Sequence, residues 1–145
     1  MNYTINRMEE NHRQYVLDMM RVFYRSDAVL TNGSEEIFTA DIDACVNDNP
    51  YLEGYVFQSD NEILGYTMIA KSFSTEFGKR CIWIEDIYLK EEYRGMGLAT
   101  AFFKMLEEKY SDAIFRLEAE EENRRAIKTY RKNGFTVMPY LEMKK

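Results

Sequence analysis

The stretch that decides the fold reads Glu91-Glu92-Tyr93-Arg94-Gly95-Met96-Gly97-Leu98-Ala99-Thr100. A strongly apolar run, Cys81 to Leu89, precedes it, and apolar residues at helical spacing from Leu98 to Tyr110 follow it. The stretch is therefore predicted to lead from a strand to a helix through a charged loop with two glycines. Glycines at a helix start let a ligand approach the backbone, and the free amide groups of the first turn favour an anion. The ten residues leave two interpretations open: a seat for a pyrophosphate-sized anion or an ordinary tight turn.

The composition indicates one globular domain, residues 1–145, because an apolar content of 46% suffices for a buried core. The formal net charge of -6 argues against nucleic acid as a partner and suits a cationic substrate. The N-terminus lacks the basic and apolar regions of a signal peptide, and no apolar run is long enough to span a membrane. We therefore expect a cytoplasmic protein that binds neither nucleic acid nor a membrane.

Cysteine and histidine, the usual ligands of zinc, are scarce in this sequence. Cys45 and Cys81 are the only cysteines, and His12 is the only histidine. The cysteines have apolar neighbours and are predicted to be reduced, structural thiols. Without a cluster of cysteine and histidine at ligand spacing, no metal site is expected. A Ser-His-Asp triad is equally hard to build here.

The rest of the chain alternates between strand-like and helix-like patterns. Ser34 is a predicted helix cap and Gly134 a predicted helix stop. Tight turns join the three strands between Tyr51 and Leu89, which predicts an antiparallel meander, whereas the next strand follows a helix and should run parallel to its neighbour. The order β-α-α-β-β-β-α-β-α-β-β predicts an α/β fold, a mixed sheet with helices on both faces. Strands are predicted at 3–8, 51–58, 63–74, 81–89, 113–119, 135–138 and 140–143, and helices at 12–24, 35–46, 98–110 and 123–133.

Two nucleotide-binding loops compete as interpretations of the glycine stretch. A phosphate-binding loop of the nucleotide-hydrolase type needs Lys-Ser or Lys-Thr after its last glycine, whereas Leu98-Ala99 follows Gly97. A dinucleotide fold would match Gly95-x-Gly97-x-x-Thr100, with Glu118 near the position of its ribose-binding acid. Against this fold, Thr100 replaces the third glycine, a five-residue loop separates strand from glycine, and hairpins make the sheet mixed.

Two motifs give the chain a family resemblance that covers nearly its whole length. Arg94-Gly95-Met96-Gly97-Leu98-Ala99 matches the signature (Gln/Arg)-x-x-Gly-x-(Gly/Ala). Asn123-x-x-Ala126-Ile127-x-x-Tyr130-x-x-x-Gly134-Phe135 matches a second signature of the same family at the usual separation. The chain thus resembles the GCN5-related N-acetyltransferases (GNAT), and the acyl-CoA N-acyltransferase fold of that family is expected here.

The resemblance implies acetyl-CoA as the donor and direct attack of a primary amine on the thioester in a ternary complex. The glycine turn would bind the pyrophosphate, and the strand before it, which splays from the next strand in this family, would bind the pantetheine arm. An amide of that strand, that of Leu89, would polarise the thioester carbonyl. The Arg94 side chain either adds charge or packs. Contacts to acetyl-CoA are expected from Ile87, Tyr88, Leu89, Arg94, Gly95, Met96, Gly97, Leu98, Ala99, Thr100 and Asn123.

The departing thiolate needs a proton, and Tyr130 is the predicted general acid. A tyrosine titrates near ~10, so it is protonated at neutral pH and can donate as negative charge develops on sulfur. Asn123, Ala126 and Tyr130 recur at helical spacing and share one face. Asn123 is therefore expected both to cap the helix and to bind the arm. A buried tyrosine with a purely structural role is the alternative.

Three carboxylates are candidates for the general base that takes a proton from the attacking amine. Glu85 ranks first, Glu118 second and Asp86 third. Glu85 and Asp86 are adjacent on a strand, so their side chains point to opposite faces unless a bulge intervenes. Charges in an apolar strand are costly, which makes the pair informative. Glu118 lies five residues before Asn123. This position is similar to that of the glutamate that acts as the base in ribosomal-protein N-terminal acetyltransferases.

The acceptor is expected to be a small cationic amine such as a polyamine. The run Glu85 to Leu89 resembles the corresponding strand of polyamine acetyltransferases, where the acid helps to hold a cationic substrate. Acceptor specificity is expected from residues 23–38, with Tyr24, Glu85 and Asp86 as substrate-binding residues. A protein N-terminus or a lysine side chain is an alternative acceptor, and a non-catalytic acyl-CoA sensor is an alternative function. A homodimer is one possible assembly.

Overall fold

The computed structural model describes residues 1–145. The five strands form one sheet in the order β1-β2-β3-β4-β5, in which β4 and β5 are parallel and the other neighbours are antiparallel. No helix is long and apolar enough to cross a membrane. The elements are β1 (Thr4–Arg7), a 3-10 turn (Glu10–His12), α1 (Arg13–Phe23), α2 (Glu35–Val46), β2 (Leu52–Ser59), β3 (Glu62–Ser74), β4 (Lys79–Leu89), a second 3-10 turn (Glu91–Tyr93), α3 (Leu98–Lys109), β5 (Ile114–Leu117) and α4 (Arg124–Lys132).

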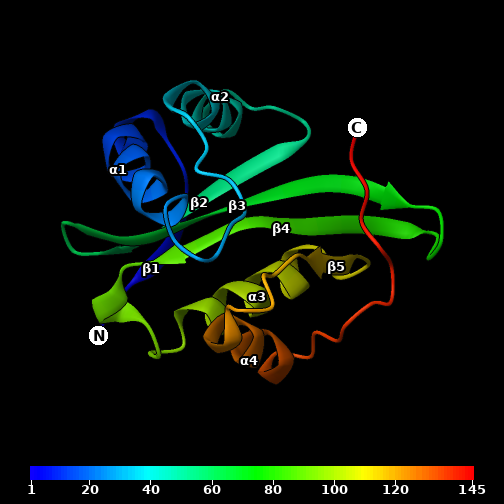
Figure 1. The fold of residues 1–145 in the computed structure, drawn as a ribbon. Coiled ribbons are helices and arrows are strands. Elements are labelled where there is room, and N and C mark those ends of the chain that lie inside the picture. The colour runs from blue at the N-terminus through cyan, green and yellow to red at the C-terminus, as the bar shows by residue number, and fades with distance from the viewer.

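Helices cover both faces of the sheet, as predicted (Figure 1). The helices α1 and α2 lie on one face, and α3 and α4 lie on the other. Alternate side chains of β2 supply the two cores, because neighbours along a strand point to opposite faces. Val56 packs in the core that contains Met20 and Phe38, whereas the Phe57 ring meets Phe102 edge-on in the other core.

The predicted cap of α2 and the predicted stop of α4 are both confirmed. Ser34 caps α2 because its hydroxyl oxygen accepts a hydrogen bond from the Ile37 N–H at 3.2 Å. Gly134 follows α4 with a φ of 90°, a left-handed conformation that glycine adopts without strain. Cys45 and Cys81 are both buried and unpaired, which confirms the prediction of structural thiols.

The sheet forks between β4 and β5. The last residue pair of these two strands is Ile84 with Leu117, and β4 continues to Leu89 without a partner on that side. A β-bulge lies at the same place, because Met68 of β3 pairs with Asp86 while the next residue, Ile69, pairs with Ile84. Glu85 is therefore the extra residue of the bulge. The fork creates the space in which the candidate site lies.

The prediction of two final strands, 135–138 and 140–143, is wrong. No residue after Phe135 takes part in a backbone hydrogen bond, and the chain from there to its end belongs to no helix or strand. Pro139 lacks an N–H and cannot donate to a ladder. The side chains of Val137, Leu141 and Met143, which alternate like those of a strand, are left exposed. The observed sheet therefore ends at β5.

Candidate active site

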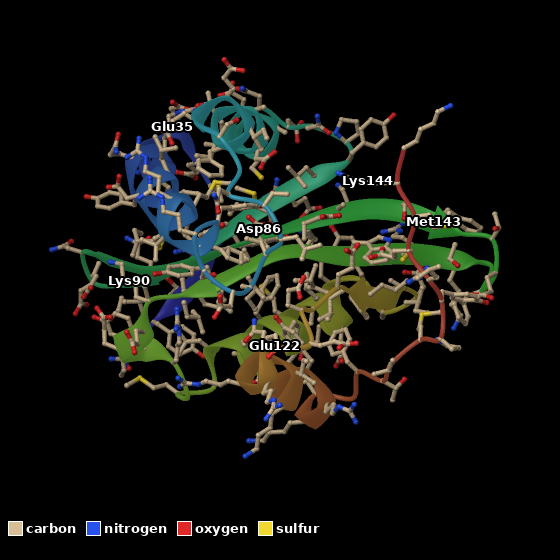
Figure 2. All side chains as sticks on the ribbon, viewed as in Figure 1. Glu35, Asp86, Lys90, Glu122, Met143 and Lys144 are labelled. Atoms are coloured by element: carbon tan, nitrogen blue, oxygen red, sulfur yellow. The ribbon has the colours of Figure 1, made fainter.

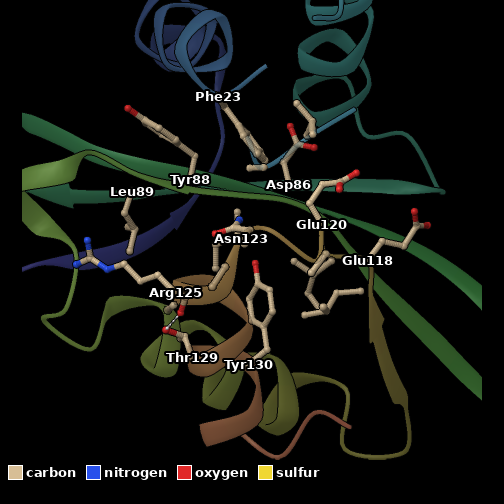
Figure 3. Close-up of a pocket in the computed structure, with 18 of the residues that line it drawn as sticks. Phe23, Asp86, Tyr88, Leu89, Glu118, Glu120, Asn123, Arg125, Thr129 and Tyr130 are labelled. Carbon is tan, nitrogen blue, oxygen red and sulfur yellow. Dashed lines mark hydrogen bonds between the residues drawn. The ribbon is translucent and has the colours of Figure 1, made fainter. Parts of the chain in front are cut away.

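One large cavity, ≈ 690 Å³ in volume, opens at the fork between β4 and β5. The end of α1, the second half of β4, the glycine turn and α4 supply most of its walls (Figure 3). Of the residues predicted to form the site, only Met96 is absent from the lining. Those that line the cavity are Tyr24, Glu85, Asp86, Ile87, Tyr88, Leu89, Arg94, Gly95, Gly97, Leu98, Ala99, Thr100, Glu118, Asn123 and Tyr130.

The glycine turn presents unbonded backbone N–H groups to the cavity. Gly95 and Gly97 have φ values of 76° and 84°, so both occupy the left-handed region that favours glycine. No backbone N–H group from Gly95 to Thr100 has a backbone acceptor in the protein, and the first bonded one is Ala101, which donates to the Gly97 carbonyl at 3.0 Å. No side chain caps the helix at Gly97. The turn can therefore bind an anion with its own amide groups.

Two cationic side chains, Arg125 and Lys132, lie on the same side of the cavity as this turn. A methyl group added at Gly95 would lie 3.7 Å from the Arg125 guanidinium. The Asn133 amide donates to the Thr100 hydroxyl at 3.0 Å, so the end of α4, including Lys132, lies beside the start of α3. Positive charge at this end of the cavity adds to the attraction that the helix dipole exerts on an anion.

Arg94 packs back on β4, which is one of the two roles expected for it. Its Nε donates to the Leu89 carbonyl at 2.8 Å, and its guanidinium carbon lies 5.6 Å from the centre of the Tyr88 ring. The hydrogen bond comes from the side of β4 that has no neighbouring strand. Arg94 thus ties the glycine turn to the end of the strand that precedes it.

The free edge of β4 places one backbone amide toward the cavity. The Lys90 N–H donates to the Leu64 carbonyl of β3 at 2.9 Å. Backbone N–H groups alternate in direction along a strand, so the Leu89 N–H points away from β3. On that side β5 has already ended. The Leu89 amide is therefore a free donor at the fork.

Tyr130 extends from α4 with its hydroxyl toward the cavity (Figure 3). Its ring makes edge contacts with Phe103 and Phe135, with centroids 6.1 Å away in both cases. Burial raises the pKa of Tyr130 to about 12, and no neighbouring charge or hydrogen bond contributes. The hydroxyl is therefore protonated at neutral pH and is not committed to another residue.

Asn123 stands at the start of α4 but does not cap it, contrary to prediction. Its backbone carbonyl accepts a hydrogen bond from the Ile127 N–H at 3.1 Å, but its side chain makes no capping bond. Its φ and ψ of -82° and 62° lie outside the extended region typical of a cap residue. The side chain instead lines the cavity, where Figure 3 shows it close to the fork.

Carboxylates gather at the opposite end of the cavity, where the strands part. Glu85 and Glu118 are the first residues beyond the last β4–β5 pair, and Glu142 of the C-terminal segment lies with them. Burial, a hydrogen bond with Glu142 and the Glu142 charge raise the pKa of Glu118 to about 7. Burial and the charges of Asp86 and Glu142 raise the pKa of Glu85. None of the three carboxylates takes part in an ion pair.

Asp86 is held more rigidly than its neighbour, Glu85. It is 5% exposed and accepts hydrogen bonds from the hydroxyls of Tyr24, at 2.9 Å, and Tyr66, at 2.8 Å. Burial raises its pKa, against the effect of these two bonds. The bulge at Glu85 lets both acids line one cavity, as the strand alternation alone would not. Figure 2 shows Asp86 between the α1–α2 layer and the sheet.

Sequence reasoning missed three residues of the site. Tyr66 of β3 carries no motif, and only the fold brings it to Asp86. Arg125 lies inside the second motif, two residues after Asn123, but no spacing rule marks it as a neighbour of Gly95. Glu142 falls in a segment that was predicted to be a strand, and its approach to Glu118 depends on the path of the unpaired chain.

Comparisons with known proteins agree with this geometry. The chain is 36% identical over 75 residues to thialysine N-epsilon-acetyltransferase of Bos taurus. The match covers 50% of this chain and 44% of that protein, so it spans less than half of the relative's length.

Two solved structures share the fold over the whole chain. A possible acetyltransferase from Clostridium difficile 630 superposes with a TM-score of 0.82 at 17% identity, covering 100% of this chain and 97% of that one. An aminoglycoside N-acetyltransferase in complex with CoA superposes with a TM-score of 0.80 at 12% identity, covering 99% and 94%. The family model for the acetyltransferase (GNAT) family matches residues 14–135. The chain therefore belongs to the GNAT family of acetyltransferases.

Proposed function

We propose that the protein transfers the acetyl group of acetyl-CoA to a primary amine of a small cationic acceptor such as a polyamine. The observation that carries this proposal is that the two ends of the cavity differ in charge. Free amides and cations lie at the glycine turn, and carboxylates without ion pairs lie at the fork. An anionic donor fits one end and an ammonium group fits the other. The relative named thialysine N-epsilon-acetyltransferase and the fold neighbour solved with CoA support the same assignment.

The donor would lie along the line from the glycine turn to the fork. The amides of Gly95 to Thr100 would bind the pyrophosphate, with Arg125 and Lys132 adding positive charge. The free edge of β4, Ile87 to Leu89, would pair with the pantetheine arm. The Leu89 N–H would then stabilise the negative charge that develops on the thioester oxygen during attack.

Two proton transfers complete the reaction. The attacking amine loses a proton as its nitrogen bonds to the acetyl carbon, and the C–S bond breaks as the thiolate receives a proton from Tyr130. Glu85 is the first candidate for the base and Glu118 the second, because both acids stand at the fork. A carboxyl pKa of about 7 at Glu118 would suit a base at neutral pH. Asp86, bound by two tyrosines, would hold the cationic acceptor in place.

The test has two steps. Acetyl-CoA should raise the thermal unfolding temperature and NAD should not, because only a ligand of the native state stabilises it. Release of CoA thiol should then be followed with polyamines, lysine, an aminoglycoside and peptides with a free N-terminus. Turnover of polyamines above the other amines is the expected result.

Three outcomes would contradict the proposal in different ways. Stabilisation by NAD alone would reject the acetyl-CoA site. Binding of acetyl-CoA without turnover of any amine would favour the acyl-CoA sensor. Preferred turnover of peptides would identify a protein N-terminus or a lysine side chain as the acceptor.

A further inference from the structure

Asn133, the C-terminal cap residue of α4, joins this helix to the glycine turn. Its side-chain amide nitrogen donates two hydrogen bonds, one to the Thr129 carbonyl at 2.8 Å and one to the Thr100 hydroxyl at 3.0 Å. Thr129 lies one turn earlier on α4, whereas Thr100 lies in the first turn of α3 and lines the cavity. Neither Thr100 nor Asn133 is a specified position of the two sequence motifs.

The Thr129 carbonyl determines which way the Asn133 amide is turned. A carbonyl oxygen only accepts hydrogen bonds, so the Asn133 atom beside it must be the nitrogen and not the oxygen. The same nitrogen has a second hydrogen, which it donates to Thr100. The Thr100 hydroxyl is therefore the acceptor in its bond with Asn133, and it must donate its own proton to another group.

The Thr100 hydroxyl proton has no acceptor within the protein. A threonine in a helix can donate to the carbonyl one turn earlier. Thr129 makes this bond, to the Arg125 carbonyl at 3.2 Å (Figure 3), whereas Thr100 makes none. The free proton lies in the same turn as the unbonded backbone amides from Gly95 to Thr100. Because the Asn133 amide donates to the hydroxyl, it also makes that hydroxyl a stronger donor.

We propose that Asn133 is a positioning residue that orients the Thr100 hydroxyl to donate a hydrogen bond to the pyrophosphate of acetyl-CoA. This role rests on the proposed function, in which the pyrophosphate lies at the glycine turn. Asn133 acts through Thr100, because Thr100 lines the cavity and Asn133 does not. The pyrophosphate would thus accept a side-chain hydrogen bond in addition to those of the backbone amides.

A double-mutant cycle in the affinity for CoA, measured by calorimetry, tests this arrangement. Thr100→Val removes the hydroxyl but keeps the shape of the side chain. It should weaken CoA binding about ten- to hundredfold, the loss expected for a hydrogen bond to a charged group. Asn133→Ala should weaken CoA binding about three- to tenfold, because the hydroxyl loses its fixed orientation. In the Thr100→Val background, Asn133→Ala should cause no further loss.

Two further variants separate this role from a structural role of Asn133 at the end of α4. Thr100→Ser keeps a hydroxyl, so Asn133→Ala should weaken CoA binding in that background as well. Asn47→Ala is the matched control, because Asn47 is the exposed C-terminal cap residue of α2, does not line the cavity and should not affect CoA binding. Full affinity in Thr100→Val or in Asn133→Ala, or an equal loss from Asn133→Ala with and without the hydroxyl, would overturn the inference.

Kinetics distinguish a failure of this role from a failure of the proposed function. If an amine is acetylated, Asn133→Ala should raise KM for acetyl-CoA without lowering kcat, because it removes binding shared by the substrate and the transition state. A fall in kcat without a rise in KM would mean that the substitution displaces Tyr130 through α4, and it would overturn the inference. If no amine is acetylated, the proposed function fails, but coupling of Asn133 to Thr100 in CoA affinity would still support this role. Absence of CoA binding would overturn both.

Discussion

The Tyr130 hydroxyl has the properties of a proton donor because of where its ring lies. The ring packs against Phe103 and Phe135, which also contact each other, and this burial alone raises the pKa of Tyr130 to about 12. A neutral hydroxyl in an apolar pocket stays protonated at neutral pH. It can therefore donate its proton as negative charge develops on the sulfur during breakage of the C–S bond.

The substitution Tyr130→Phe tests this role directly. It removes the proton but keeps the ring and its contacts, so folding should be preserved. We expect kcat to fall by about a hundredfold or more, the usual range for loss of a general acid. Affinity for acetyl-CoA, measured by calorimetry, should not change. The exposed Tyr15 on α1 offers a matched control, since Tyr15→Phe should leave kcat intact. Full activity of Tyr130→Phe would remove this residue from the mechanism.

At the scale of elements, the geometry of β4 depends on a close approach to β3. A Cβ atom added at Gly65 would lie 2.3 Å from the Tyr88 carbonyl oxygen, which is backbone and cannot rotate away. The two strands are therefore closer at this position than any other residue would allow. Tyr88 and Leu89 follow the bulge at Glu85, so the approach also positions the free edge that faces the cavity.

The substitution Gly65→Ala should force β3 and β4 apart. We expect the free energy of unfolding to fall by about 1–3 kcal/mol, the usual cost of overpacking. Urea denaturation measures this loss. Because the Leu89 amide would move with β4, affinity for acetyl-CoA should fall as well. Unchanged stability would mean that the strands can separate at Gly65 without cost.

Features that depend on residues close together in the sequence could be predicted, whereas features that depend on residues far apart in the sequence could not. The glycine turn and the face shared by Asn123 and Tyr130 follow from neighbours within a few residues, and the structure has both. The bulge at Glu85 depends on pairing with Met68 and Ile69, which no local pattern encodes. The prediction of two final strands was wrong for a related reason. An alternating pattern shows that a segment can join a sheet, but it does not supply a neighbouring strand for it.

At the scale of the molecule, the cavity joins two layers that have separate cores. Tyr24 comes from the α1 side of the sheet and Tyr130 from the α4 side, and the fork lets both reach one space. The chain carries an excess of acid, with a net charge of -6, yet Arg125 lies beside the glycine turn and Lys132 lines the same cavity. This separation of charge lets the two substrates be attracted to opposite ends of the same cavity.

A second cluster of charges, far from the motifs, holds the sheet to α3. Glu53 of β2 is 4% exposed and forms ion pairs with Arg7 of β1, Lys71 of β3 and Lys109 of α3. The hydroxyl of Tyr55 donates to it at 2.5 Å, and that of Tyr110 donates as well. Burial works to raise the pKa of Glu53, but the hydrogen bonds outweigh it and lower the pKa to about 2. One carboxylate thus connects four elements.

The pH dependence of stability should reveal this carboxylate. Since the pKa of Glu53 is lower in the folded than in the unfolded protein, its contribution is complete above about pH 4.5 and is lost as the pH falls toward 2. At pH 7, Glu53→Gln should lower the free energy of unfolding by about 1–3 kcal/mol, because donors around it lose a charged acceptor. Between pH 4.5 and 2 the variant should lose less stability than the unmodified protein. The exposed Glu108 on α3 supplies the control, Glu108→Gln. If Glu53→Gln and Glu108→Gln had the same stability at pH 7 and the same loss between pH 4.5 and 2, the cluster would contribute nothing to stability.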